Sequence, residues 1–181
     1  MRVLVVHHAV DAASSLDDAD VLEQAAWVAS GLRALGVETE IASCDLDLRP
    51  LLDHCRRWRP DAAFNLVECL GGSDRLAFLA PALLETLGIP CAGSPARVLQ
   101  DLASKTAVKE RLRLAGLPTP DWLDAGSVAT AGDPGGRWIV KPIWEHASRT
   151  MAADAVVDAA DDADLRRTLA ARGAKSLEVC A

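Results

Sequence analysis

The sequence predicts an α/β protein whose first half forms a parallel β-sheet and whose second half adds a smaller α+β module. Three observations support this prediction. Strand-like and helix-like segments alternate through residues 1–93, the segment 62–67 is nearly all apolar, and a Gly/Pro-rich break lies at 116–120. A continuous apolar strand is typical of a parallel sheet covered on both faces. The alternation favours the same sheet, with right-handed crossovers and a site at the carboxyl ends of the strands.

The first half gives its strands and helices in regular order. Strands are predicted at residues 1–8, 37–42, 62–67 and 89–92. The helices between them carry apolar residues three or four positions apart on one face. These residues are Val21, Ala25, Val28, Leu32 and Leu35 in the first helix, Leu51, Leu52, Cys55 and Trp58 in the second, and Leu76, Leu79, Leu83, Leu84 and Leu87 in the third. Gly36 and Gly88 are expected to end helices, Pro50 to lie in a first turn, and Pro81 to mark a break or a new first turn.

The second half has a different order of elements. A helix-rich stretch follows Gly93 and runs to the break at 116–120, whose prolines extend the chain. A turn is expected at 132–136 and a strand at 138–141 that Pro142 stops. A helix at 161–171 and a final strand at 176–180 complete the pattern. We therefore predict two domains, residues 1–93 and residues 94–181.

The composition narrows the classes of function. Half of the 181 residues are hydrophobic, which is enough apolar material for a real core. The formal net charge of −7 argues against a nucleic-acid partner, because such binding draws most of its affinity from clustered Lys and Arg. Small-molecule ligands are therefore favoured.

The cysteines and the start of the chain predict the compartment. The five cysteines include no C-x-x-C pair that would suggest zinc or a redox dithiol. They are expected to be reduced and mostly buried thiols. The apolar run at the start of the chain is too short for a signal peptide or a membrane span. A cytoplasmic protein with no membrane partner is the default expectation.

Three segments taken together resemble one known family. The first covers residues 64–94 and contains Phe-Asn-Leu-Val-Glu, Gly-Gly-Ser-Asp and Ile-Pro-Cys-Ala-Gly-Ser; the second covers 101–120; the third is Trp-Ile-Val-Lys-Pro, continuing to Ser148. Each piece alone occurs in many α/β proteins. Their order and spacing are similar to the ATP-grasp family, specifically its D-alanine-D-alanine ligase branch. The resemblance implies a Rossmann-like pre-ATP-grasp domain at 1–93, followed at 94–181 by the α+β central (lid) subdomain of an incomplete ATP-grasp fold.

The resemblance implies an ATP-dependent carboxylate-amine ligase. In that family a carboxylate takes the γ-phosphoryl group of ATP and becomes an acyl phosphate, which an amine attacks to form a peptide bond. Cations around the transferring group stabilise the transition state more than the ground state. ATP and magnesium are the implied cofactors, an amino acid or another carboxylate the implied substrate, and peptidoglycan biosynthesis the implied setting. The ligases it resembles are commonly homodimers through the N-terminal domain.

Four residues are expected by this resemblance to bind ATP: Lys105, Lys141, Ser148 and Glu178. Lys105 matches a phosphate-contacting lysine; the alternative is a solvated helix lysine. Lys141, matched to the α-phosphate and adenine side, is unusual by itself, because a cation ending an apolar strand is not expected in a dry core. Ser148 is the best hydroxyl donor in the loop 143–150, which lacks the glycines that let backbone N–H groups approach phosphate. Glu178 is either an adenine- and ribose-side acid or an exposed strand-end carboxylate.

Two weaker candidates for substrate binding lie at the carboxyl ends of predicted strands, where α/β sites form. His7 ends the first strand, and Glu68 follows the third, where the ligases usually carry a substrate-contacting histidine. Glu68 would pair with a substrate ammonium group, or it is simply solvated. Asp74 is expected to cap the helix that follows it. The loop 9–19 lacks the glycines usual in this family, so the amine and the carboxylate that are joined stay open.

The resemblance stops before the part of the fold that supplies the magnesium ligands, so no catalytic or metal-binding residue is predicted. We expect the 181-residue chain to be a partial form without ligase activity of its own. Two other hypotheses stay open. The chain is a non-catalytic ATP-grasp-like module for binding or oligomerisation, or residues 1–93 are a flavodoxin-like or nucleotide-binding domain. The lack of G-x-G-x-x-G after the first strand weakens a dinucleotide role.

Overall fold

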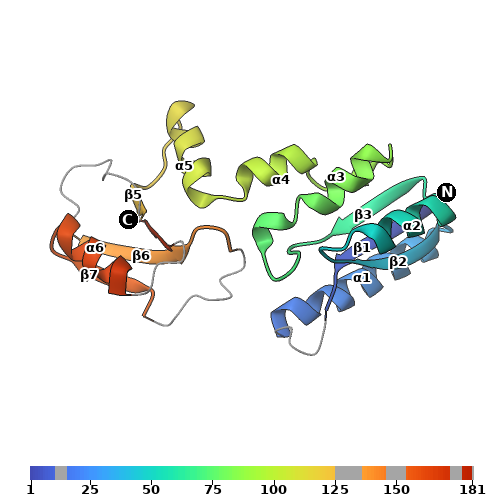
Figure 1. Ribbon diagram of the computed structural model, residues 1–181, viewed down its shortest axis with the longest axis horizontal. Helices are drawn as coiled ribbons and strands as arrows, with labels where there is room; N and C mark the ends of the chain where they lie inside the picture. The colour runs from blue at the N-terminus through green and yellow to red at the C-terminus, as the bar shows by residue number, and fades with distance from the viewer. Residues whose placement is uncertain (11–15, 125–135, 146–153, 172–176, 181) are drawn as a thin grey trace. The chain divides into compact units, whose positions relative to one another are not determined.

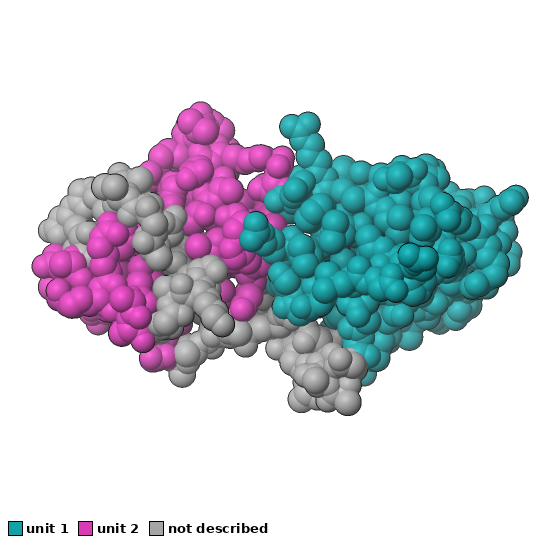
Figure 2. Space-filling view, viewed as in Figure 1, with its two compact units in different colours: residues 1–100 teal, residues 101–181 magenta. Residues whose placement is uncertain are grey.

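The computed structural model describes residues 1–10, 16–124, 136–145, 154–171 and 177–180. The chain divides into two compact units, Met1–Gln100 and Asp101–Ala181, coloured teal and magenta in Figure 2. Each unit contains a sheet of four described strands. The domain boundary predicted between residues 93 and 94 lies a few residues before this division.

The first unit contains a parallel sheet in the order β2-β1-β3-β4 (Figure 1). Its strands are β1 Arg2–His8, β2 Glu38–Cys44, β3 Ala62–Leu66 and β4 Cys91–Ala92. β1 pairs with two neighbours, so that Val5 is aligned with Ile41 on one side and with Phe64 on the other. Residues 3–8 of β1 are all buried, as expected for a parallel strand with helices on both faces. The predicted parallel sheet is confirmed.

Helices cover the two faces of this sheet. They are α1 Leu16–Ala34, α2 Arg49–Trp58 and α3 Leu79–Thr86, with the 3-10 turn η1 Asp74–Leu76 before α3. A further helix, α4 Ala96–Leu102, follows β4. Val5 of β1 packs against Ala25 and Ala29 of α1. Leu4 and Val6 belong to a separate cluster with residues of α2 and α3. The sheet separates these clusters because successive residues of a strand point to opposite faces.

Two helices of the first unit begin or end differently from the prediction based on the spacing of apolar residues. The periodicity places Leu35 on the buried face of the first helix, but Leu35 is 81% exposed. The reason is that α1 ends at Ala34, and Gly36 then turns the chain with a φ of 77°, which favours glycine. The predicted helix at 76–87 is divided between η1 and α3. Pro81 lies in the first turn of α3, where its missing N–H loses no intrahelical bond.

The second unit contains an antiparallel sheet in the order β5-β8-β6-β7. Its elements are α5 Lys105–Leu114, β5 Trp122–Asp124, β6 Gly136–Pro142, β7 Val156–Ala159, α6 Asp162–Ala171 and β8 Leu177–Cys180. α6 covers one face of the sheet, where Leu165 and Leu169 pack in a cluster with Leu123, Trp138 and Val140. The predicted α+β character of the second half is confirmed.

Two strands of the second unit, β5 and β7, were not predicted from the sequence. β5 has three residues and β7 has four, so neither is long enough for a clear alternation of apolar and polar positions. β7 also lies at the edge of the sheet in an Ala/Asp-rich stretch, and Val156 at its start is 54% exposed. Only pairing with β6 identifies it as a strand. Within the described ranges, no helix combines the length and the apolar character needed to cross a bilayer.

Candidate functional site

The helix α5 begins with a capped first turn. Ser104 is the N-cap residue with extended backbone angles (φ −95°, ψ 121°), and its Oγ accepts a hydrogen bond from the N–H of Ala107 at 3.3 Å. This bond satisfies one of the N–H groups that a helix start leaves without an intrahelical partner. Ser104 is itself buried, at 7% exposure. The cap therefore fixes Lys105 as the first residue of the helix.

Lys105 is tied to the segment that leaves β6. Its backbone N–H donates to the carbonyl oxygen of Ile143 at 3.1 Å, and its Nζ donates to the carbonyl oxygen of Pro142 at 2.8 Å. The same Nζ donates to the carbonyl oxygen of Glu145. A charged donor strengthens such bonds relative to neutral ones. The ammonium group of Lys105 is thus half-buried and held at the exit of β6.

Lys141 lies on the face of the second sheet that is opposite to α6. Trp138 and Val140 are buried in the cluster with α6, so the alternating positions Ile139 and Lys141 point to the other face. Both of these residues are half-buried. In the backbone register, Lys141 is the partner of Glu178 on β8.

Three of the four residues predicted to bind ATP therefore converge at one end of β6. Lys105 contacts the residue that follows Lys141, and Lys141 is aligned with Glu178. The fold brings them together from three separate parts of the chain. The fourth residue, Ser148, lies outside the described residues. The roles of all four in binding ATP stay predictions.

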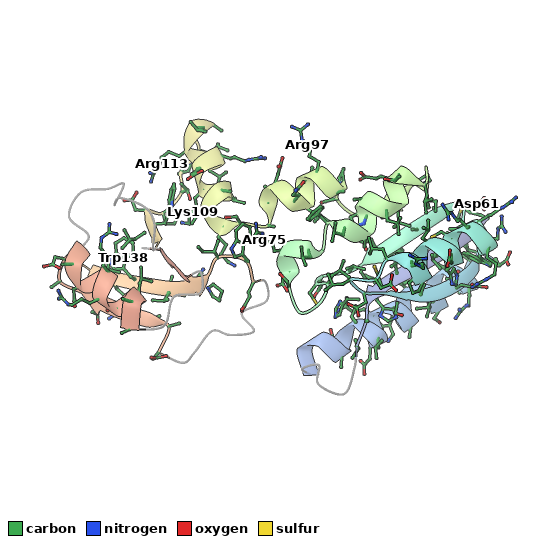
Figure 3. The ribbon with its side chains drawn as sticks, in the orientation of Figure 1. Asp61, Arg75, Arg97, Lys109, Arg113 and Trp138 are labelled. Atoms are coloured by element: carbon green, nitrogen blue, oxygen red, sulfur yellow. The ribbon has the colours of Figure 1, made fainter. Side chains whose placement is uncertain are left out.

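The other end of α5 is fastened through Trp122. The guanidinium carbon of Arg113 lies 4.2 Å from the centroid of the Trp122 ring, and Nζ of Lys109 lies 5.7 Å from it. Figure 3 labels both cations on α5. Arg113 also pairs with Asp121 at 2.9 Å, and Lys109 donates to the carbonyl oxygen of Pro120 at 2.9 Å. Because Trp122 is only 5% exposed, the cation–π attraction acts at a largely desolvated ring.

These contacts were not predicted from the sequence, although a signal for them exists. Lys109 and Arg113 are four residues apart, which places two like charges on one helix face at an energetic cost. A shared aromatic partner offsets that cost. Trp122 and Ile139 are both aligned with the same residue of β8, so they point to the same face of the sheet. α5 therefore packs on the face that also carries Lys141.

His7 and Glu68 lie at the carboxyl edge of the parallel sheet in the first unit. His7 is aligned with Leu66, the last residue of β3, and Glu68 follows two residues later. His7 is 8% exposed, and its Nδ1 lies 2.7 Å from the carbonyl oxygen of His8. Because a carbonyl oxygen only accepts, Nδ1 is the donor in this hydrogen bond. Glu68 is exposed. The structure places both residues at one edge, and their substrate-binding roles stay predictions.

Asp74 is not the helix cap that the sequence suggests. It is the first residue of η1, and Ser73 occupies the N-cap position with extended backbone angles. Asp74 is 5% exposed, so its carboxylate belongs to the interior of the first unit. Sequence preference alone does not separate a cap from a first-turn acid, since acids favour both positions.

Four cysteines of the first unit are suited to packing rather than to chemistry. Cys44, Cys55 and Cys69 are buried and Cys91 is half-buried, and all four are free thiols. Burial raises the pKa of the Cys44 thiol to about 12, and it also raises the pKa of the Cys55 and Cys91 thiols. A neutral thiol is a poor nucleophile and a poor metal ligand. Across the described residues, no group of three or more His, Cys, Asp or Glu is placed to hold a metal ion.

Comparison with known proteins identifies similar folds. No protein-family model and no curated protein sequence matches the chain. The structure is similar to D-alanine-D-alanine ligase from Bacillus anthracis complexed with ATP, with a TM-score of 0.67 and 22% identity over 99% of this chain and 57% of that chain. It is also similar to the D-alanine-D-alanine ligase from Coxiella burnetii, with a TM-score of 0.66 and 17% identity over 99% of this chain and 63% of that chain. For the L-amino acid ligase from Bacillus licheniformis, the TM-score is 0.56 and the identity is 15%, over 99% of this chain and 44% of that chain.

The chain therefore has the fold of the ATP-grasp ligases, over a part of their length. Within that class its fold is similar to that of the D-alanine-D-alanine ligases, which confirms the resemblance seen in the sequence. The chain spans 57% and 63% of the lengths of the two D-alanine-D-alanine ligases.

Proposed function

We propose that this chain is the N-terminal and central part of an ATP-dependent carboxylate-amine ligase of the D-alanine-D-alanine ligase type. Such an enzyme phosphorylates a carboxylate with ATP, and an amine then displaces phosphate to form a peptide bond. The observation that supports the proposal is the convergence of Lys105 and Lys141 at the end of β6, on this fold. A role in peptidoglycan biosynthesis in the cytoplasm, as a homodimer, belongs to the same proposal.

The two lysines have complementary parts in the proposed binding of ATP. Lys141 is a half-buried cation beside Ile139 on the sheet face opposite to α6, where α5 also packs. A cation next to an apolar side chain fits a nucleotide, whose phosphates need positive charge and whose base needs an apolar surface. Lys105 holds two carbonyl oxygens, and a phosphate oxygen is a stronger acceptor because it is charged. Phosphate would therefore replace a carbonyl oxygen at Nζ of Lys105.

The remaining predicted residues complete this arrangement. Glu178, the register partner of Lys141, would receive the adenine amino group or the ribose, and Ser148 would donate to phosphate. Glu68 is exposed at the carboxyl edge of the parallel sheet, where a carboxylate would meet the ammonium group of an amino-acid substrate. His7 would line the same edge with its Nε2.

No residue is proposed as a magnesium ligand, because the described residues contain no group of three or more His, Cys, Asp or Glu placed to hold a metal ion. A magnesium ion bound with ATP would add charge stabilisation to phosphoryl transfer. We therefore propose that the 181-residue chain binds ATP without forming an acyl phosphate. Its match to 57% of a D-alanine-D-alanine ligase is consistent with this proposal.

Titration calorimetry of the purified chain with ATP tests the nucleotide site. Lys141→Ala should weaken ATP binding by about tenfold or more, since a charge-assisted bond to phosphate is lost. Arg137→Ala is the matched control, because Arg137 lies on the same strand and the same face but pairs with Asp158 at 3.4 Å on the surface. An equal loss in both variants would contradict the site. Tighter binding of NADH than of ATP would favour a dinucleotide domain instead.

Turnover separates the proposed partial ligase from an active one. The purified chain with ATP, magnesium and D-alanine should release no phosphate above the background rate. Phosphate release that depends on ATP and magnesium would contradict the partial form. ATP affinity that is unchanged in Lys141→Ala would favour the second candidate, a non-catalytic ATP-grasp-like module for binding or oligomerisation.

A further inference from the structure

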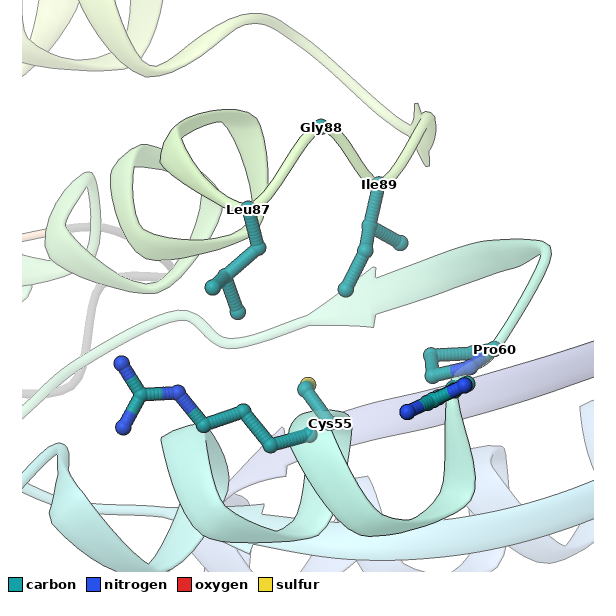
Figure 4. A pocket seen from close by; sticks show the side chains of 7 residues that line it. Cys55, Pro60, Leu87, Gly88 and Ile89 are labelled. Carbon is teal, nitrogen blue, oxygen red and sulfur yellow. The ribbon is translucent and has the colours of Figure 1, made fainter.

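A pocket of about 460 Å³ lies at the amino edge of the parallel sheet (Figure 4). It is formed between the connection that leads from α2 into β3 and the connection that leads from α3 into β4. Pro60 and Ile89, which line it, both come shortly before their strands begin. His7 and Glu68 lie at the carboxyl ends of the strands. The pocket is therefore a different place from the candidate substrate edge of the same unit.

The walls of the pocket combine polar and apolar surface in about equal parts. Figure 4 shows Leu87 and Ile89 on one side and Cys55 and Pro60 on the other. Gly88 joins Leu87 to Ile89 with a φ of 70°, and a Cβ added there would meet no atom within 4 Å. The volume falls in the range of about 300 to 1,000 Å³ that is usual for small-molecule sites. The apolar part of the wall, formed by Leu87, Ile89 and Pro60, suits an aliphatic group.

Two cations line the same pocket. Arg56 lies in the last turn of α2, and Arg59 follows as its C-cap residue. Arg59 has φ 52° and ψ 65°, and among the described residues it is the one non-glycine residue with a positive φ. Glycine is the usual residue at a left-handed helix end, since a side chain there costs about 1 kcal/mol or more. The backbone does not explain why an arginine occupies this position.

Both arginines are exposed, and the described residues do not balance their charge. Within the described part of the chain, neither the Arg56 nor the Arg59 side chain has an ion pair or a hydrogen bond. The Cys55 thiol does not neutralise them, because burial raises its pKa and keeps it protonated at neutral pH. The helix dipole favours cations in the last turn of α2. That effect applies equally to Arg57, which does not line the pocket.

We infer that this pocket binds a small organic anion with an aliphatic body, such as a medium-chain carboxylate. The carboxylate would pair with Arg56 and Arg59, because a guanidinium group matches carboxylate geometry with two parallel N–H donors. The aliphatic body would pack against Leu87, Ile89 and Pro60. The site belongs to the first unit alone, and it does not depend on the proposed binding of ATP.

Titration of the full chain with octanoate, followed by the backbone amide resonances, tests this inference. Saturable shifts are expected at the amides of Cys55, Gly88 and Ile89. Octylamine and octanol have the same chain length without the negative charge, and they should bind about tenfold more weakly or worse. No saturable shift with octanoate, or equal binding of octylamine, would overturn the inference. Inorganic phosphate binding as tightly as octanoate would overturn the role of the aliphatic body.

A set of arginine variants separates the pocket from general surface charge. The double variant Arg56→Gln with Arg59→Gly should weaken octanoate binding by about tenfold or more. Glycine accepts the left-handed conformation at position 59, so the double variant should keep its fold. Arg57→Gln is the matched control, and it should change octanoate affinity by less than about twofold, since Arg57 lies outside the pocket. The single variant Arg56→Gln leaves position 59 untouched and should still weaken binding. Equal losses in Arg57→Gln and Arg56→Gln would overturn the assignment.

Discussion

The helices α2 and α3 of the first unit and the helix α5 of the second are held to their sheets by different interactions. α2 buries Leu51 at 1% exposure, and α3 buries Leu84 at 0%. The structure describes every residue of α5, and none of them is fully buried. α5 is held instead by Lys105 at its start and by two cations on the ring of Trp122 near its end.

This difference shows which helix an anionic ligand is able to influence. Apolar burial is non-directional and does not compete with a charged ligand for the same atoms. Hydrogen bonds from an ammonium group are directional, and a better acceptor is able to replace the carbonyl oxygens. Lys105 belongs both to the anchoring of α5 and to the proposed ATP site. If the proposed ATP site is correct, the second unit combines structural support and ligand contact in the side chain of Lys105.

The largest effect on the free energy of unfolding is expected from Leu84→Ala. The variant leaves a cavity beneath α3, so the free energy of unfolding should fall by about 3 kcal/mol. Guanidinium chloride denaturation followed by circular dichroism measures the change. Leu114→Ala is the matched control, because Leu114 is 88% exposed on α5 and should cost less than about 0.5 kcal/mol. Similar losses in both variants would contradict the apolar anchoring of α3.

A smaller loss is expected from Trp122→Leu, which keeps an apolar side chain but removes the aromatic face. The free energy of unfolding should fall by about 2 kcal/mol, since two cation–π contacts and part of the buried area are lost. Hydrogen exchange should show reduced protection of the α5 amides. Trp27→Leu provides the comparison, because Trp27 is 82% exposed on α1. Unchanged protection of α5 in Trp122→Leu would show that other contacts hold the helix.

Lys105→Met should lower the free energy of unfolding by about 1.5 kcal/mol, because charge-assisted bonds to backbone carbonyl groups are lost at a half-buried position. Arg111→Met serves as control on the same helix, since the Arg111–Asp101 pair at 2.9 Å is largely exposed. That pair should contribute less than about 1 kcal/mol. Chemical denaturation measures both variants. A greater loss in Arg111→Met would contradict the anchoring role of Lys105.

The smallest effect concerns pH and the core of the first unit. The folded state keeps the Cys44 thiol protonated up to a pKa of about 12, whereas the unfolded thiol ionises near its ordinary value of 9.0. Above pH 9 the unfolded chain loses a proton that the folded chain keeps, so stability falls as pH rises towards 12. The loss due to this thiol should be about 1 kcal/mol at pH 10. Cys44→Ala removes this contribution, so its stability should decline less between pH 8 and pH 10. An equal loss of stability between pH 8 and pH 10 in the unchanged protein and in Cys44→Ala would contradict this role of the Cys44 thiol.

Much of the first unit could be predicted because its signals are local. The apolar run of β3, the glycine after α1 and the alternation of strands and helices are all visible in short windows of sequence. The exposure of Leu35 was missed because helix periodicity does not say at which turn the helix ends. β5 and β7 were missed because strands of three and four residues are defined by their partners.

The candidate site was also predicted only in part from the sequence. The sequence by itself predicted an apolar strand at 138–141 that carries Lys141, although β6 continues through Pro142, and it suggested Lys105 and Glu178 through a family resemblance. The tertiary structure alone decided that Nζ of Lys105 reaches the carbonyl oxygen of Pro142, 37 residues further along the chain, and that Lys141 is aligned with Glu178. It also decided that Arg56 and Arg59 line a pocket with Leu87 and Ile89. Contacts between distant segments depend on how the sheets are paired, and no short stretch of sequence contains that information.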